Sequence, residues 1–248
     1  MKDFTPTKRQ EEILTLLYRF RFLDTRHFQK LLNHKHPQRV QVWLKSLHEE
    51  SFIGRIYSNT FTENTKPAVY HLTPKGRKIL KKKEGIDITI LERVYREKNR
   101  SERLRQHCLL LADIYLDLLV LNKNSLHFFT KVDIVNYSNF PQPLPDAYIV
   151  IKDNRYFLEI IDEGIPRFAI RSMINKYIQH EQDGLWEENT DKPFPQVLIV
   201  SSNHKTKDWL KRYLKKKVDD EKLEISFFLA LKDDIQKRGI RSDTWVGI

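Results

Sequence analysis

The stretch PDAYIVIKDNRYFLEIIDEG, residues 145–164, decides how the second half of the chain folds. Its two apolar runs, 146–151 and 155–161, flank KDNR, in which Asp and Asn favour a tight turn. The pattern predicts two strands joined by that turn. Asp146 opens the first strand, and Glu159 lies inside the second. Because an ionised carboxylate within a sheet is costly unless it is paired or binds a cation, these two either hold a metal or face solvent.

The segments around this stretch alternate between helical and extended patterns. We expect a long amphipathic helix over residues 101–121, followed by the extended run LHFFTKVDIV. After the two strands come a helix in PRFAIRSMINKYIQHEQ, a buried strand in VLIVSS, a surface helix in HKTKDWLKRYLKKKVDDE and a last strand in LEISFFLAL. The order α-β-β-β-α-β-α-β predicts an α/β fold, α+β for the chain as a whole, with a mixed sheet.

Residues 1–85 have a different pattern of three helices and a hairpin. Apolar residues recur at helical spacing in KRQEEILTLLYRFRF, LDTRHFQKLLN and PQRVQVWLKSLHEESF. Start signals for these helices come from Thr7, from Asp24 or Thr25, and from Pro37. The strand-like runs IGRIY and AVYHLT then flank a polar loop, which predicts a β-hairpin with a long tip.

This order resembles the winged helix-turn-helix, a DNA-binding domain whose third helix enters the major groove while the hairpin, or wing, contacts the backbone or minor groove. L-x-x-L near the end of the third helix, SFIGRI and VYHLTPKGRKIL carry the resemblance. It implies base or phosphate contacts from the third helix and a phosphate contact from the wing. The alternatives are an ordinary solvated helix face and a winged helix that binds only protein. The implied DNA contacts are Gln38, Arg39, Gln41, Lys45 and, on the wing, Lys66.

The charge balance and the cysteine content indicate the class of protein. The chain has 248 residues, and 44 Lys and Arg against 33 Asp and Glu give a net charge of +11. This balance favours anionic partners, with nucleic acid first and an acidic membrane surface second. Cys108 is the single cysteine, so no intrachain disulfide can form, and a reducing cytoplasm fits. Without a signal core or an apolar run of about 20 residues, we expect a cytoplasmic protein with no membrane partner.

The element order around the two carboxylates resembles the restriction-endonuclease-like core, whose motif is PD, a spacer and (D/E)xK. Pro145-Asp146 is followed thirteen residues later by Glu159. In such cores, neighbouring strands present two carboxylates that hold Mg²⁺, and the metal polarises the scissile phosphate and helps to form hydroxide. Ile161 stands where the motif has lysine, and Lys176 on the following helix is the candidate replacement. Otherwise the core is degenerate and binds without cutting.

A narrower resemblance covers both halves of the chain. RLRQHCLLLADIYLDLL, PLPDAYIVI, YFLEIIDEG and MINKYIQH, downstream of a winged helix, are similar to the replication-relaxation family of bacterial plasmids and integrative elements. The chain departs from that family in having two residues between Glu159 and Asp162, where the family usually has one. The positions that match the family pattern are His107, Pro145-Asp146-Ala147, Glu159 with Asp162 and Gly164, and Lys176-Tyr177.

Together the resemblances imply a DNA-binding domain over 1–85, a charged connector over 86–100 and a nuclease-like domain over 101–248. The expected partner is double-stranded DNA, and a homodimer stays open. The expected role is in the replication or mobilisation of a plasmid or mobile element, or in the control of these processes. The alternatives are a Mg²⁺-dependent DNA endonuclease that nicks or cuts, and a transcriptional regulator or protein-interaction adaptor.

Overall fold

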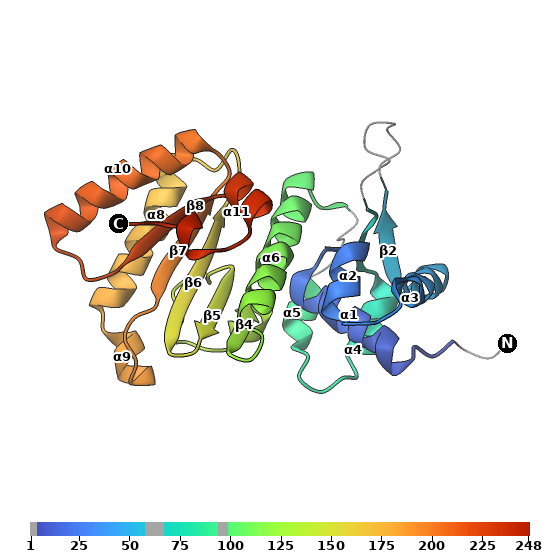
Figure 1. The fold of residues 1–248 in the computed structure, drawn as a ribbon. Helices are drawn as coiled ribbons and strands as arrows, with labels where there is room; N and C mark the ends of the chain where they lie inside the picture. Colours follow the sequence, from blue (N-terminus) through green and yellow to red (C-terminus); the bar gives the residue numbers. More distant parts are fainter. Residues whose placement is uncertain (1–3, 58–66, 94–98) are drawn as a thin grey trace. The chain divides into compact units, whose positions relative to one another are not determined.

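The computed structural model describes residues 4–57, 67–93 and 99–248. The chain divides into two compact units, Met1–Leu116 and Asp117–Ile248 (Figure 1). The first unit is mostly helical with a small sheet, and the second is built on a six-stranded sheet.

Helices dominate the first unit, and local capping explains where several of them begin. The N–H of Thr7 donates to Gln10 Oε1 at 2.9 Å, and Asp24 Oδ1 accepts the N–H of His27 at 3.0 Å, so both caps satisfy groups at a helix start. The first three helices are α1 (Lys8–Phe20), α2 (Thr25–Leu31) and α3 (Pro37–Glu49). Two shorter helices follow the hairpin: α4 (Pro74–Leu80) and α5 (Ile88–Arg93).

The small sheet contains the predicted hairpin and one further strand. The hairpin strands β2 (Ile53–Ile56) and β3 (Val69–Leu72) pair antiparallel, and β1 (Leu23–Asp24) pairs with the other edge of β3. The sequence pattern does not predict β1, because two residues are too few to show an alternation. Apolar side chains from the helices and the hairpin form the core of this unit, including Ile13, Leu14, Leu17, Phe28, Leu44, Leu47, Phe52 and Leu72.

The second unit contains the mixed sheet that the sequence predicts. Strands β4, β5 and β6 pair antiparallel, β6, β7 and β8 pair parallel, and β9 adds an antiparallel edge. In order across the sheet, the strands are β4 (Leu126–Thr130), β5 (Ala147–Ile151), β6 (Asn154–Ile161), β7 (Gln196–Ser201), β8 (Phe227–Leu231) and β9 (Val246–Gly247).

Helices α8 (Arg167–Gln182) and α10 (His204–Glu221) connect the parallel strands and pack on the same face of the sheet (Figure 1). This placement follows from two successive right-handed crossovers that move across the sheet in one direction. Two short helices, α9 (Leu185–Thr190) and α11 (Lys232–Arg238), were not predicted from the sequence. The core beneath α8 and α10 includes Phe157, Ile174, Tyr177, Val197, Leu210, Leu214 and Phe227.

The prediction of one extended run in LHFFTKVDIV is wrong in its second half. The strand β4 ends at Thr130, and a single helical turn, α7 (Lys131–Ile134), follows. The N–H and Oγ1 of Thr130 donate to Asp133 Oδ2 at 2.7 and 2.9 Å, respectively. This capping box starts the turn and places Lys131 at its first position.

The predicted helix over 101–121 is present as α6 (Glu102–Leu121), which runs from the end of the first unit into the second. Within the described ranges, no helix combines the length and the apolarity needed to cross a membrane.

Candidate functional site

The exposed face of α3 holds most of the predicted DNA-contacting residues. Gln38, Gln41, Val42 and Lys45 lie at spacings of three and four residues, so their side chains form one stripe along the helix. All four are exposed, and Val42 is an apolar residue that remains 54% exposed within this polar stripe. The buried residues of α3 lie on the opposite face: Val40, Leu44 and Leu47.

Two further predicted DNA contacts are the cations Arg39 and Lys66. Arg39 is exposed and lies beside the stripe, about 100° around the helix from Gln38. Lys66 lies outside the described residues. On the stripe itself, Lys45 Nζ is 3.8 Å from Glu49 Oε1, an exposed pair that restrains the lysine only weakly.

A groove of about 620 Å³ lies between α3 and the β2–β3 hairpin. Gln41 and Lys45 line it from α3, while Arg55 and Tyr57 line it from β2 and the residue after it. Sequence reasoning did not select Arg55 or Tyr57. The alternation in IGRIY gives no signal for Arg55, because a strand places it on the same face as Ile53, two residues earlier, and Ile53 is buried.

The two predicted carboxylates are both buried in the second unit, with Asp146 4% and Glu159 8% exposed. The N–H of Asp146 donates to the carbonyl of Leu158 at 2.9 Å, and Asp146 Oδ2 accepts the N–H of Ile160 at 2.8 Å. Asp146 is therefore hydrogen-bonded to the residues on both sides of Glu159. The structure brings these two residues together on neighbouring segments, as the sequence predicts for strands β5 and β6.

A lysine that sequence reasoning missed contacts this pair. Lys131, at the start of α7, places Nζ 2.6 Å from Asp146 Oδ1, and its side chain is 52% exposed while Asp146 is buried. The ion pair compensates part of the cost of burying the Asp146 charge. No sequence signal marks Lys131, because its position depends on the turn that ends β4.

Tyr177 closes the cluster from α8. Its hydroxyl donates to Glu159 Oε1 at 2.7 Å, and the side chain is 1% exposed. Burial raises the pKa of Tyr177 well above its ordinary value, and the charge of Glu159, the hydrogen bond to it and the charge of Asp146 raise it further. The hydroxyl therefore stays protonated and acts as a donor. We refer to Lys131, Asp146, Glu159 and Tyr177 as the carboxylate cluster.

Lys176 lies on another face of α8. It is exposed and lines a shallow surface pocket with Arg171, Asn175 and Gln179. Tyr177, one residue later and about 100° around the helix, is the residue that turns inward. The ammonium group that contacts Asp146 thus comes from Lys131, and Lys176 has the position of a surface residue.

Mg²⁺ is often held by one or two carboxylates together with substrate phosphates. Asp146 and Glu159 meet that requirement in number. However, both Asp146 oxygens already accept bonds, from Lys131 and from the N–H of Ile160. Among the described residues, no group of three His, Cys, Asp or Glu side chains could hold a metal ion. As arranged, the donors fit an ion-paired carboxylate cluster and not a metal centre.

Three further family positions are His107, Asp162 and Gly164. His107 is half-buried on α6, in the first unit, and Asp162 is half-buried directly after β6. Gly164 has a φ of 81°, a left-handed conformation that glycine adopts without strain, in the turn that leads to α8.

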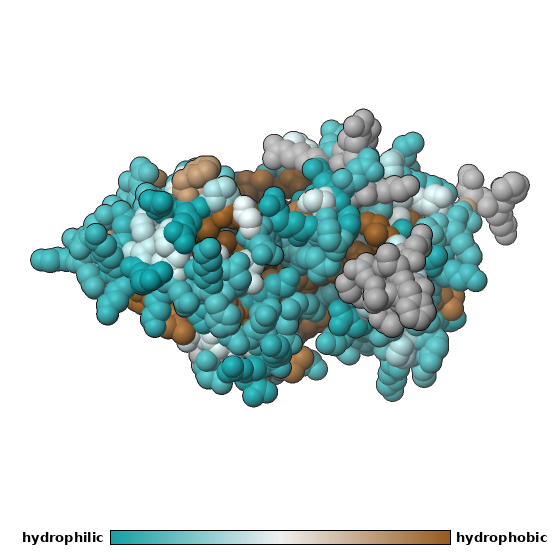
Figure 2. All heavy atoms as spheres, turned by 90° about the horizontal axis from the view of Figure 1, so that it is seen from above, coloured by the Kyte–Doolittle hydropathy of each residue, from teal (hydrophilic) through white to brown (hydrophobic). Residues whose placement is uncertain are grey.

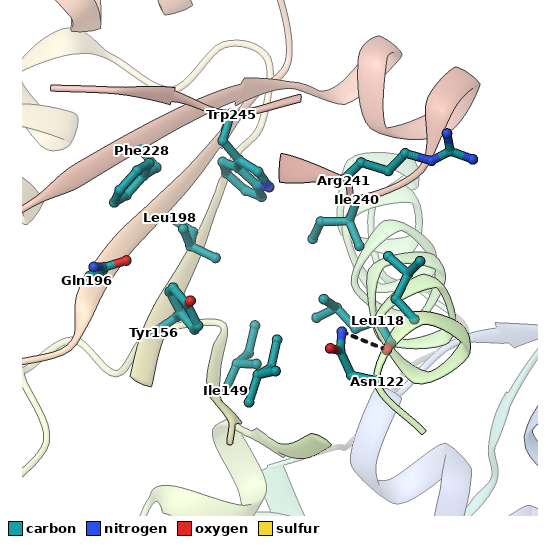
Figure 3. Close-up of a pocket in the computed structure, with 12 residues that line it drawn as sticks. Leu118, Asn122, Ile149, Tyr156, Gln196, Leu198, Phe228, Ile240, Arg241 and Trp245 are labelled. Carbon is teal, nitrogen blue, oxygen red and sulfur yellow. Dashed lines mark hydrogen bonds between the residues drawn. The ribbon is translucent and has the colours of Figure 1, made fainter. Parts of the chain in front are cut away.

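A pocket of about 510 Å³ lies on the sheet face opposite α8 and α10 (Figure 3). Figure 3 shows Leu118 and Asn122 facing it from α6, and Ile149 and Leu198 facing it from the sheet. The Asn122 amide donates to the carbonyl of Leu118 at 3.3 Å. No residue predicted from the sequence lines this pocket, whose wall is mostly apolar.

Comparison with known proteins gives one match. A search of curated proteins found no match, and a search of solved structures found none either. The family model described as Replication-relaxation matches residues 14–197, which include α3 and every residue of the carboxylate cluster. The match covers most of the chain and agrees with the resemblance in the sequence, so this chain belongs to the replication-relaxation family.

Proposed function

We propose that this chain binds double-stranded DNA through the first unit and acts in the replication or mobilisation of a plasmid or mobile element, or in the control of these processes. Family membership supports a replication-related role on such an element. The net charge of +11 supports a polyanionic partner.

The arrangement of α3 and the hairpin carries the proposal. Three helices followed by an antiparallel hairpin, with β1 on the free edge of β3, have the element order of a winged helix-turn-helix. In that domain, the third helix enters the major groove, and α3 is the helix with an exposed polar stripe. The groove beside it places Arg55 and Tyr57 on the same side as Gln41 and Lys45.

Each stripe residue suits a different contact in the major groove. The Gln41 amide can pair with the N6 and N7 edge of adenine, and the exposed Val42 side chain can contact the methyl group of thymine. Lys45 and Arg39 suit phosphate oxygens or guanine. Arg55, on the hairpin, suits the backbone beside the groove.

The test is to select duplexes from a random pool with the full chain and to measure binding of the selected duplex by fluorescence anisotropy. Gln41→Ala should cost about 1–3 kcal/mol and relax selectivity at one base pair. Lys45→Ala should weaken binding to all duplexes and lower the slope of log K against log salt by about 1. Lys78→Ala, an exposed charge on α4, is the matched control and should leave binding unchanged.

The salt dependence separates this proposal from the adaptor alternative. Binding through about six phosphates should weaken about a thousandfold between 50 and 200 mM salt. A shallow dependence, with equal binding by the Gln41, Lys45 and Lys78 variants, would favour a protein-interaction adaptor and reject the proposal.

We further infer that the second unit is a nuclease-like core that binds without cutting. Its element order supports the likeness to restriction-endonuclease-like cores. The bonds that Asp146 makes to Lys131 and Ile160 support the absence of cleavage, because a metal would compete with an ammonium group that lies 2.6 Å from the carboxylate.

One observation favours a second candidate function, Mg²⁺-dependent DNA cleavage: the cluster combines two carboxylates with a lysine, the residue types of the (D/E)xK motif. Supercoiled plasmid incubated with the chain and Mg²⁺ or Mn²⁺ distinguishes the two. We expect no nicked or linear product. Cleavage that is lost in both Asp146→Ala and Glu159→Ala, but kept in Lys176→Ala, would establish the endonuclease instead.

A further inference from the structure

The outer sides of α8 and α10 form a second basic surface, in the second unit. We define the α8–α10 surface by Arg167, Phe168 and Arg171 on α8 and Trp209, Arg212 and Lys216 on α10. Arg171 follows Arg167 by four residues, and Arg212 and Lys216 follow Trp209 by three and seven, so each set lies along one flank of its helix. The opposite sides of both helices are buried against the sheet.

Direct contacts join the two helices along this surface. The Arg167 guanidinium lies over the Trp209 ring, 5.2 Å from its centroid. The Trp209 ring stacks on Tyr213 at 5.5 Å with an interplanar angle of 13°. The Tyr213 hydroxyl is 3.4 Å from Asn175 Oδ1 on α8. The surface is therefore continuous from one helix to the other.

The charge of this surface is not balanced. Residues 167–178 of α8 contain three cations and no acidic residue, and residues 205–217 of α10 contain seven cations and one acidic residue, Asp208. No described carboxylate lies within 4 Å of the charged nitrogens of Arg167, Arg171, Arg212 or Lys216. Figure 2 shows the surface around α10, at the left, as hydrophilic with pale and brown patches between. An unneutralised cluster of this kind favours a polyanion.

An exposed aromatic side chain on this surface indicates which polyanion. Phe168 is 72% exposed, and it lines a shallow pocket of about 430 Å³ with Arg171, Asn175 and Lys176. Trp209 is half-buried and lies under the guanidinium of Arg167, the residue before Phe168. Cations that follow a backbone, interleaved with aromatic rings on which bases stack, characterise single-strand binding surfaces. A duplex keeps its bases stacked on one another and offers none to Phe168.

We propose that the α8–α10 surface binds single-stranded DNA, with Arg171, Arg212 and Lys216 on phosphates and the exposed Phe168 ring stacked on a base. This site goes beyond the duplex-binding function proposed for α3 and rests on that function only for the choice of DNA over RNA. The two surfaces lie in different units, so duplex binding and single-strand binding can be measured separately.

The test measures anisotropy of a fluorescein-labelled 20-nucleotide oligo-dT with the full chain, and in parallel binding to the selected duplex. Phe168→Ala should weaken binding to oligo-dT about tenfold through lost stacking and leave duplex binding unchanged. Arg171→Ala with Arg212→Ala should reduce the salt slope by about 1.4, which corresponds to two single-strand phosphates. Oligo-dT should also quench tryptophan fluorescence, and Trp209→Phe should remove most of the quenching.

Matched controls separate the two surfaces. Tyr137→Ala removes another exposed aromatic ring of the second unit, and Lys192→Ala removes another exposed charge, and neither should change oligo-dT binding. Lys45→Ala should weaken duplex binding alone. Unchanged oligo-dT binding in Phe168→Ala, or equal loss of duplex binding in that variant, overturns the proposal. Unchanged oligo-dT binding in Lys45→Ala, with weakened duplex binding, supports two separate surfaces. If the chain binds no duplex, the α3 proposal fails, and oligo-dT binding that is weakened by Phe168→Ala still supports this surface.

Discussion

Replacing Tyr177 by phenylalanine removes one buried hydroxyl from the carboxylate cluster and keeps the ring. The ring packs against Phe157 with centroids 5.6 Å apart, so phenylalanine preserves this contact. What is lost is the 2.7 Å hydrogen bond to Glu159. A hydrogen bond to a charged group contributes about 1.5–3 kcal/mol, so Tyr177→Phe should lower the free energy of unfolding by about 2 kcal/mol at neutral pH.

Urea unfolding followed by tryptophan fluorescence measures this loss. Of the four tryptophans, Trp186, Trp209 and Trp245 lie in the second unit, so the signal reports mainly on the unit that holds the cluster. With an m-value of about 2 kcal/mol per molar urea, a loss of about 2 kcal/mol lowers the midpoint by about 1 M. Tyr156→Phe is the control, because the Tyr156 hydroxyl makes no hydrogen bond to the described residues and its loss should cost under about 0.5 kcal/mol.

The stability difference between the native chain and Tyr177→Phe should also depend on pH. Burial, with the charge of Glu159, raises the pKa of Tyr177 in the folded state above the value of about 10 expected for the unfolded chain. The protonated hydroxyl therefore contributes stability that is fully present below about pH 10 and is lost as the pH rises through the raised pKa. The difference between the native chain and Tyr177→Phe should shrink above pH 10. Equal midpoints at pH 7, or a difference that stays constant to pH 11, would refute this reasoning.

Two further predictions concern the first unit. Gly76→Ala should destabilise by about 2 kcal/mol in thermal unfolding, although alanine favours helices, because the added Cβ would lie 2.2 Å from the carbonyl oxygen of Phe52; a stabilised variant would contradict this. Burial opposes protonation of His27, but the hydrogen bonds and charges of Asp113 and Asp24 outweigh it and raise its pKa. The contribution of protonated His27 to folding stability should be complete below about pH 6.5 and should decline as the pH rises through its raised pKa. The melting temperatures of the native chain and of His27→Gln should therefore converge toward alkaline pH. Melting curves that stay parallel between about pH 5.5 and 8.5 would exclude this linkage.

Much of the local structure is readable in the sequence, because its causes are local. The apolar periods of α1, α2 and α3, the caps at Thr7 and Asp24, and the turn between β5 and β6 all depend on residues a few positions apart. The mixed sheet follows from the order of strands and helices. The convergence of Asp146 and Glu159 was also predictable, since adjacent segments of a tight hairpin must pair.

The outward position of Lys176 was available in the sequence as well. Ile170, Ile174, Tyr177 and Ile178 recur at helical spacing, and all four are buried, which leaves Lys176 on the exposed side of α8. Lys176 is the residue type that the (D/E)xK pattern asks for, but this helical period places it away from the buried side of α8.

The contact between Lys131 and Asp146, and the formation of β1, depend on tertiary structure alone. Lys131 lies fifteen residues before Asp146, and it meets that carboxylate because β4 ends in a capped turn beside the start of β5. β1 is only two residues long and exists because β3 offers it a free edge. Periodicity and capping depend on residues a few positions apart, so they can be recognised in the sequence. The contact partner of a side chain depends on how the packing of the whole unit brings distant segments together, so it cannot be recognised there.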